Sequence, residues 1–215
     1  MKKNHLLIVI LSIGALALGL WLNYSLSSKN SPQAEHHIEG LFWPQTKSLT
    51  DFTLTDQHEQ PFTLNKLKGH WSLVFFGYTH CPDVCPTTMV VLKGVKQQLV
   101  AHAEETANTQ YIFVSVDGHR DTASVLANYM NYFDPTFIGV NGTDEQIKAL
   151  TGQLGVVYMK VAESNPDNYL VDHSASILLF DPLGRMIALF SAPHTVEGIT
   201  ARYLAIRQFL NKEYP

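Results

Sequence analysis

Residues 75–86 read FFGYTHCPDVCP, and the expected fold is built around them. This stretch holds Cys81 and Cys85, the two cysteines of this 215-residue chain. An apolar, strand-like run over residues 71–78 precedes the pair, and apolar residues at helical spacing predict a helix over about residues 86–103. The pattern therefore predicts a buried strand leading into a helix, with both thiols at the positive end of the helix dipole, which is expected to lower the pKa of the thiols.

Two closely spaced thiols are compatible with three roles. A disulfide between Cys81 and Cys85 would close a short loop and remove little chain entropy. Dithiol exchange typically uses two intervening residues, whereas this pair is separated by Pro82, Asp83 and Val84. Thiolates also select soft ions such as Cu(I). Because two sulfurs are too few for a closed zinc site or an iron-sulfur cluster, metal binding would need a further ligand, and histidine is the obvious donor.

The chain has ten histidines, and His173 is the one whose position singles it out. It stands directly before a strand predicted over residues 174–180, which should lie beside the thiol-bearing strand. On spacing alone, a ligand and an ordinary core or strand-cap residue are equally good interpretations of His173. His80 adjoins Cys81 but should project in another direction, and the pair His36-His37 fits a solvated linker.

Composition excludes several classes of protein. Hydrophobic residues make up 46% of the chain, so extensive disorder is not expected. The formal net charge of −4 argues against a nucleic-acid partner, which would require a basic face. The composition instead fits a mildly acidic domain whose partners are proteins or small cations.

The N-terminal region predicts a single membrane anchor. Residues 6–22 are uncharged and follow Lys2 and Lys3. The length of this run, seventeen residues, is at the short end for a membrane-spanning helix. A cleaved signal peptide is the competing interpretation. The expected organisation is a cytoplasmic N-terminus at 1–5, a transmembrane anchor at 6–23, a linker at 24–45 and a soluble domain at 46–215.

The two lysines would hold the N-terminus in the cytoplasm and place the domain on the opposite side. No Arg- and Ser-rich leader of the organellar kind is present. We therefore expect a single-pass protein of a bacterial inner membrane with its soluble domain in the periplasm.

The order of predicted elements indicates a thioredoxin-like α/β fold. A hairpin over residues 52–64 is followed by strands and helices in β-α-β-α order, and a capping box at Thr143 and Gln146 starts another helix. Asp121 is expected to cap the helix before it. An additional hairpin and a terminal helix complete the α/β sheet with helices on both faces. The later strands are predicted at 156–161, 174–180 and 186–190.

Three motifs together resemble the Sco family, also called SenC or PrrC. They are residues 77–88 around the cysteines, the Ser115-Val116-Asp117 segment with Asp121-Thr122, and Val171-Asp172-His173-Ser174. The family consists of membrane-anchored, thioredoxin-like copper proteins that assist assembly of the CuA centre of cytochrome c oxidase. The resemblance implies that Cys81, Cys85 and His173 bind Cu(I) or Cu(II). It also implies the CuA-bearing subunit, a periplasmic copper donor and a thiol reductant as partners.

The alternative function is that of an enzyme, a thiol-disulfide oxidoreductase that uses Cys81 and Cys85 as its redox-active pair. A peroxidase is disfavoured, because Tyr78 and Pro82 stand three residues before the cysteines, where its motif requires threonine. A redox or copper sensor acting through protein contacts also stays open. The resemblance favours a copper chaperone that is not an enzyme, with thiol reduction as an accessory activity at most.

Other chemistry-bearing residues receive less specific interpretations. Asp83 and Asp117 should lie near the thiols, either tuning them or contacting a partner, or acting as turn and strand-end residues. Met159 and Met186 are expected to pack in the core, although their sulfurs are soft donors. His119 is expected to be exposed to solvent.

Overall fold

The computed structural model describes residues 14–23, 38–42, 44–161 and 169–213. The chain divides into one unit at residues 1–37 and a second at 38–215. In the first unit, residues 14–23 are helical. None of the helices described is long and apolar enough to cross a membrane. Residues 6–13 of the expected anchor, and His36-His37 in the expected linker, lie outside the described residues.

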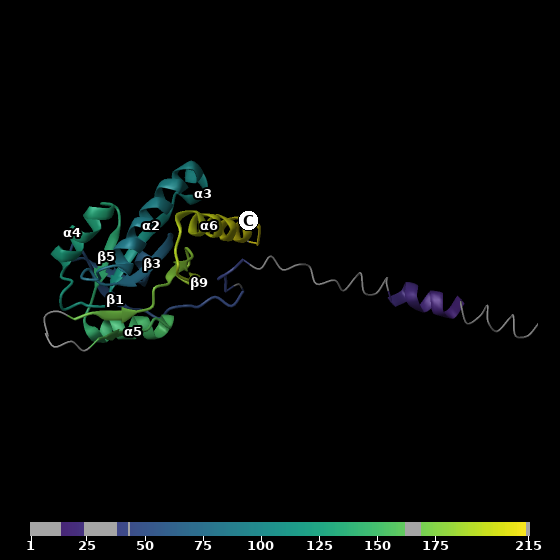
Figure 1. The fold of residues 1–215 in the computed structure, drawn as a ribbon, viewed down its shortest axis with the longest axis horizontal. Helices are drawn as coiled ribbons and strands as arrows, with labels where there is room; N and C mark the ends of the chain where they lie inside the picture. The colour runs from purple at the N-terminus through teal and green to yellow at the C-terminus, as the bar shows by residue number, and fades with distance from the viewer. Residues whose placement is uncertain (1–13, 24–37, 43, 162–168, 214–215) are drawn as a thin grey trace, which may run out of the picture. The chain divides into compact units, whose positions relative to one another are not determined.

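The domain is built on a sheet of seven strands in the order β2-β1-β5-β4-β3-β8-β9 (Figure 1). Strand β3 (Trp71–Gly77) pairs in parallel with β4 (Thr109–Ser115) and antiparallel with β8 (Ile177–Phe180). Every residue of β3 is buried, as expected for a strand that is apolar on both faces. Strand β3 thus carries the cysteine segment out of the centre of the sheet.

The remaining elements surround this centre. The other strands of the sheet are β1 (Thr53–Asp56), β2 (Pro61–Thr63), β5 (Ile138–Asn141) and β9 (Met186–Phe190). A separate two-stranded sheet joins β6 (Tyr158–Lys160) to β7 (Val171–His173). The helices of this unit are α2 (Val84–Leu99), α3 (Ala103–Thr106), α4 (Ala123–Phe133), α5 (Asp144–Leu154) and α6 (Val196–Glu213), with 3-10 turns at Leu64–Lys66 and Val100–His102.

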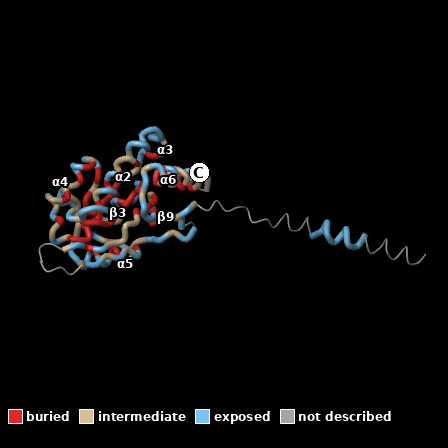
Figure 2. The backbone as a smooth tube through the Cα atoms, in the orientation of Figure 1, coloured by how far each residue is buried: buried red, intermediate tan, exposed pale blue. Residues whose placement is uncertain are grey.

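Helices cover both faces of the sheet. Helix α2 packs against α4 and α6, and α5 packs against β1 on the opposite side (Figure 1). The buried residues gather between these layers (Figure 2). The apolar side of α2 is Met89, Leu92, Val95 and Leu99, all buried against the sheet. The thioredoxin-like α/β architecture expected from the sequence is confirmed.

Most predicted elements are present, and the differences have local causes. The β1–β2 hairpin, the capping box at Thr143 and strand β9 are confirmed. Strand β5 was not predicted, because its four residues are too short for a clear pattern. The strand expected at 174–180 is shorter than predicted, since β8 begins at Ile177, and a separate strand that was not predicted, β7, ends at His173 just before that range. The expectation that Asp121 caps α4 is wrong: Thr122 is the N-cap, and its hydroxyl accepts from the Val125 N–H.

One ion pair links the helices on the α2 side. Lys96 Nζ lies 2.8 and 2.7 Å from the two carboxylate oxygens of Asp134, and 2.7 Å from Thr136 Oγ1. Burial acts to raise the pKa of Asp134, but the hydrogen bonds from Lys96 and Thr136 outweigh it, and the pKa is lowered. A carboxyl group whose folded pKa is lowered contributes stability above its unfolded pKa and loses that contribution as the pH falls through its folded pKa.

We expect Lys96→Met to lower the free energy of unfolding at neutral pH by about 0.5–1 kcal/mol, since the pair is partly exposed to solvent. The difference from the unmodified protein should shrink as the pH falls through the folded pKa of Asp134. Urea denaturation across this pH range measures it. The matched control is Lys93→Met on the same helix, because Lys93 forms no ion pair with a described residue. An equal and equally pH-dependent loss in the control would contradict the assignment.

Candidate metal centre

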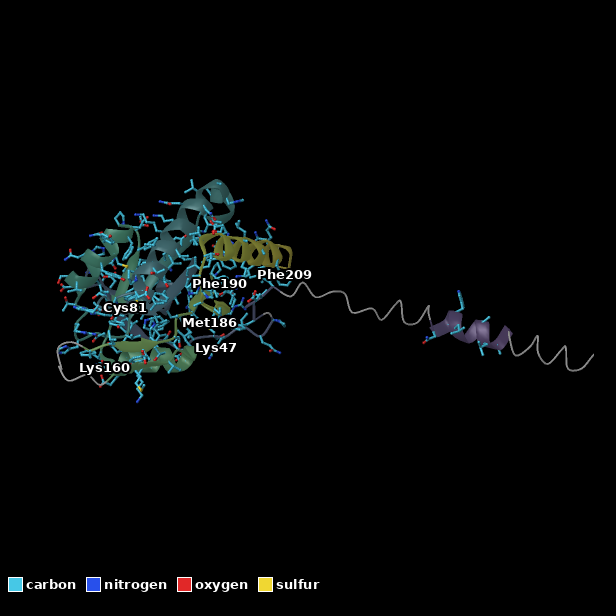
Figure 3. The ribbon with its side chains drawn as sticks, in the orientation of Figure 1. Lys47, Cys81, Lys160, Met186, Phe190 and Phe209 are labelled. Atoms are coloured by element: carbon cyan, nitrogen blue, oxygen red, sulfur yellow. The ribbon has the colours of Figure 1, made fainter. Side chains whose placement is uncertain are left out.

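The three predicted ligand residues come from three separate elements and meet at one point. Cys81 lies in the turn after β3, Cys85 in the first turn of α2, and His173 at the end of β7. Their ligand atoms all lie within 4.8 Å of one another. Both cysteines are free thiols; Cys85 is buried and Cys81, labelled in Figure 3, is half-buried. The sulfurs are therefore placed to share an ion with an imidazole nitrogen, with Cys81 nearer to solvent.

The orientation of His173 follows from its hydrogen bonds. Its Nδ1 lies 3.1 Å from the carbonyl oxygen of Ser174. A carbonyl only accepts, so Nδ1 must carry the proton, and the lone pair is on Nε2. That lone pair faces Cys85, at 3.2 Å from Nε2 to Sγ. The acceptor that fixes the imidazole is thus a backbone carbonyl, which no side-chain motif in the sequence could identify.

Aromatic neighbours hold the imidazole ring in place. The rings of Phe75 and Tyr78 both meet the His173 ring edge to face, with centroids 5.8 and 6.0 Å away. This burial lowers the pKa of His173, although the Ser174 carbonyl and Asp172 act in the opposite direction. The imidazole is therefore neutral near neutral pH, which is the state that binds a metal.

The protonation state of Cys85 differs from the sequence expectation. Burial raises the pKa of the Cys85 thiol well above its ordinary value, against a hydrogen bond from the backbone of Tyr78 that lowers it. The helix start, which was expected to lower the pKa of the thiols, does not offset this burial. Without a metal, Cys85 is a neutral thiol that donates to His173 Nε2. A metal ion that binds here must displace that proton.

A buried carboxylate, which sequence reasoning interpreted as a helix cap, holds the cysteine segment. Asp121 is fully buried. Its oxygens accept from the Thr79 N–H at 2.9 Å, the Thr79 hydroxyl at 2.6 Å and the Ser115 hydroxyl at 2.6 Å. Thr79 lies two residues before Cys81. Asp121 thus fixes the backbone that leads into the first thiol.

Other sequence candidates lie outside the cluster of ligand atoms. The side chain of His80 turns toward Thr79 and Asp121, with Nδ1 at 3.1 Å from Thr79 Oγ1. His119 is exposed, as expected. Asp83 is exposed at the N-cap of α2 and makes no capping hydrogen bond through its side chain.

The structure also places the remaining candidates, Asp117, Met186 and Met159, and only part of what was expected of them is confirmed. Asp117 is buried and contacts Arg120 and Tyr169 rather than the thiols. Met186 is buried in the core, as predicted. The core position expected for Met159 is wrong, since its exposed fraction is 64%. Strand β6, which carries Met159, belongs to the separate two-stranded sheet, so its alternating pattern does not correspond to a face of the main core.

The chemistry of the donor set is specific. Two thiolates and one neutral imidazole suit a soft ion, and a site with three protein donors leaves a coordination position for an incoming ligand. The positive end of α2 would stabilise the negative charge that two thiolates bring. The cluster therefore fits an ion that is bound and passed on, better than an ion enclosed for structural purposes.

The fold and the cluster define a class, a thioredoxin-like α/β protein with a dithiol–imidazole centre beside its central strand. The chain belongs to the SCO1/SenC family, whose pattern it matches over residues 44–207. A SCO2-like protein of Rickettsia felis is 34% identical over 194 residues, which cover 88% of this chain and 92% of that relative.

Two solved structures with copper bound are also similar. ScoI of Arabidopsis thaliana superposes with a TM-score of 0.68 at 33% identity, covering 74% of this chain and 98% of its own. ScoI of Bradyrhizobium japonicum gives a TM-score of 0.62 at 38% identity, covering 71% and 94%.

Gly77 is the residue in the strand whose lack of a side chain makes room for the centre. A Cβ built there would lie 2.7 Å from Cys85 Sγ and 3.0 Å from the Phe113 ring. We expect Gly77→Ala to displace the Cys85 sulfur and to lower the free energy of unfolding by about 1–3 kcal/mol, as in other overpacked cores. Urea denaturation of the metal-free protein measures the loss, and the alkylation rate of Cys85 reports the displacement.

The matched control is Gly152→Ala in α5, where a Cβ meets nothing within 4 Å. Because alanine favours a helix over glycine, this change should raise stability by about 0.5–1 kcal/mol. A Gly77→Ala protein as stable as the unmodified one, with unchanged Cys85 reactivity, would show that the strand does not need glycine here.

Proposed function

We propose that this protein binds copper through Cys81, Cys85 and His173 and delivers it to the CuA-bearing subunit of cytochrome c oxidase. The observation that carries the proposal is the convergence of these three side chains, with their ligand atoms within 4.8 Å of one another. Copper-bound structures of two relatives with the same fold support copper as the ion. Copper is here a cargo and not a reactant.

Binding and transfer follow from the properties of the three ligands. Loading releases the thiol protons, including the one that Cys85 shares with His173 Nε2, and replaces their hydrogen bond with two bonds to the ion. His173 needs no reorientation, because Nδ1–H already donates to Ser174. An incoming cysteine or histidine of the recipient can take the open position and displace the ligands one at a time. The half-buried Cys81 is the more accessible point of entry.

The setting of the protein forms part of the proposal. The uncharged run at 6–22 after Lys2 and Lys3 supports a single-pass anchor in a bacterial inner membrane, with the domain in the periplasm. In such an oxidising compartment the two thiols require a reductant before they bind copper. A periplasmic copper donor would supply the ion. Fractionation of cells that express the full chain, followed by protease treatment of spheroplasts, tests this placement.

We expect His173→Ala to weaken Cu(I) binding and to impair Cu(II) binding more strongly, because Cu(I) retains the two soft thiolates whereas Cu(II) loses its nitrogen donor. Anaerobic titration of the reduced protein with Cu(I), in competition with a chelator of known affinity, measures the first effect. Absorption and paramagnetic resonance spectra of the Cu(II) form measure the second.

The control is His58→Ala, which removes an exposed imidazole between β1 and β2. It should leave both affinities and both spectra unchanged. If the copper affinity and the spectra of His173→Ala equal those of the control, His173 is not a copper ligand.

A second candidate function is thiol–disulfide exchange, which the closeness and different burial of the two sulfurs favour. The Cys81 thiolate would attack a disulfide of the partner to form a mixed disulfide and release one partner thiolate. The neutral Cys85 thiol would then attack Cys81 and pass its proton to the partner thiolate already released, which frees the second partner sulfur as a thiolate and leaves a Cys81–Cys85 disulfide that a thiol reductant must reduce.

A disulfide-reduction assay run beside the copper titration distinguishes the two functions. The chaperone proposal expects stoichiometric copper binding with negligible turnover of a disulfide substrate. His173→Ala should not lower a disulfide-reduction rate, since the imidazole takes no part in that exchange. Rapid turnover together with weak copper binding would favour the oxidoreductase.

A further inference from the structure

The loop at residues 117–121, which we call the clasp loop, lies between the cysteine half and the histidine half of the metal centre. It directly follows β4 and Val116 and precedes α4. Its backbone is folded on itself, with the N–H groups of Arg120 and Asp121 donating to the Asp117 carbonyl at 3.2 and 3.0 Å. Gly118 lies so close to the carbonyl of Gly142 that a Cβ would overlap it. The loop therefore has little freedom to shift.

One end of the clasp loop holds the cysteine segment. The carboxylate of Asp121 receives both the N–H and the hydroxyl of Thr79, two residues before Cys81. The backbone carbonyl of Asp121 in turn accepts from the Asn141 side chain at 2.6 Å, which ties the loop to β5. Asp121 thus fixes the segment that leads to Cys81 relative to the sheet.

The other end of the clasp loop holds the strand that carries His173. The Tyr169 hydroxyl donates to Asp117 Oδ1 at 2.6 Å. The guanidinium of Arg120 pairs with the same carboxylate and stacks on the Tyr169 ring, with Cζ 3.6 Å from the ring centroid. Arg120 also faces the ring of Tyr78, at 5.6 Å, and Tyr78 meets the imidazole edge to face. A continuous stack of side chains therefore runs from Tyr169 to His173.

This connection matters because β7 is not a strand of the main sheet. Within the described residues, β7 pairs with β6, and the β6–β7 pair forms a sheet of its own. After His173 the chain returns to the main sheet at Ile177 in β8. Before His173, the side-chain contacts of Tyr169 add a second attachment to that of Val171, which is buried in the core and whose backbone is hydrogen-bonded to the Tyr78 side chain.

We propose that the clasp loop positions the two halves of the centre relative to each other, and that Tyr169 and Arg120 are positioning residues for His173. They touch no ligand atom. They hold β7 so that Nε2 faces the sulfurs, and their loss frees the imidazole while Asp121 keeps the cysteine segment in place. The inference deepens the proposed function, on which it rests in taking His173 as the third copper ligand.

The test begins with Tyr169→Phe in the reduced, metal-free protein, which removes one oxygen and keeps the stacked ring. Nitrogen-15 NMR of the imidazole should show a single Nδ1–H tautomer in the unmodified protein. In Tyr169→Phe, averaged tautomers and faster exchange of the ring proton are expected for His173. The alkylation rate of Cys81 should stay unchanged, because Asp121 still holds Thr79.

With copper added, Tyr169→Phe should speed the dissociation of Cu(II) about tenfold, the scale of one lost hydrogen bond to a charged group. Cu(I) dissociation should change less, since the thiolates keep their positions. Arg120→Lys retains the positive charge but not the planar stack, and should reproduce the effect on the His173 tautomer. Tyr132→Phe is the matched control, because Tyr132 is an exposed tyrosine on α4.

The proposal would be wrong if the nitrogen-15 NMR signal of His173 in Tyr169→Phe and Arg120→Lys equalled the signal in the control. A rise in the alkylation rate of Cys81 that matches the change at His173 would also contradict it, since the loop would then act on the whole site and not on one half. The proposed function fails by a different result, the absence of copper binding in the unmodified protein, and the metal-free NMR measurement still decides the clasp in that case.

Discussion

The centre depends on the antiparallel pairing of β3 with β8. This pairing aligns Val74 with Leu178 and Phe75 with Ile177 at the end of the sheet from which the cysteine segment leaves. Because β8 begins four residues after His173, the ladder that fixes β8 also limits where the histidine can lie. It brings together two ligand atoms, Cys85 Sγ and His173 Nε2, from residues 88 positions apart in the chain. Loop closure over such a distance costs entropy, which the burial of the central strands offsets.

The surroundings of the sulfurs combine opposing electrostatic effects. The start of α2 favours thiolates, but the burial of Cys85 among apolar residues favours the neutral thiol, and burial dominates. Such a site is a poor source of free thiolate and a good place for a cation, because the bound ion itself provides the positive charge that the thiolates need. The same balance limits Cys85 as a nucleophile and makes Cys81, which is nearer to solvent, the reactive member of the pair in any exchange.

Buried polar groups near the site restrict its geometry more than they add to stability. Asp121 receives three hydrogen bonds to its carboxylate, and Asp117 shares its carboxylate between Arg120 and Tyr169. A buried carboxylate is expensive to leave without partners, so each of the two selects one position for the segment that it holds. In this protein those segments are the cysteine turn, which follows a strand of the main sheet, and the histidine strand, which belongs to the two-stranded sheet.

Local sequence patterns were sufficient to predict the elements whose patterns are long or chemically explicit. These include the buried strand before the cysteines, the helix after them, the capping box at Thr143 and the hairpin around residues 52–64. Sequence motifs also identified the three residues of the cluster, although the role of His173 came from a family resemblance and not from spacing. Short β5 and exposed Met159 show the limit of such patterns, because a few alternating residues do not reveal which sheet they join.

How the cluster is held and protonated depends on contacts that exist only in the folded protein. The Ser174 carbonyl orients the imidazole, the Asp121 carboxylate receives Thr79 instead of capping α4, and burial reverses the expected shift in the pKa of Cys85. Hydrogen-bond partners and burial depend on atoms brought together from distant parts of the chain. A sequence pattern describes neighbours along one segment, whereas the energy of a buried polar group depends on all the neighbours that surround it in space.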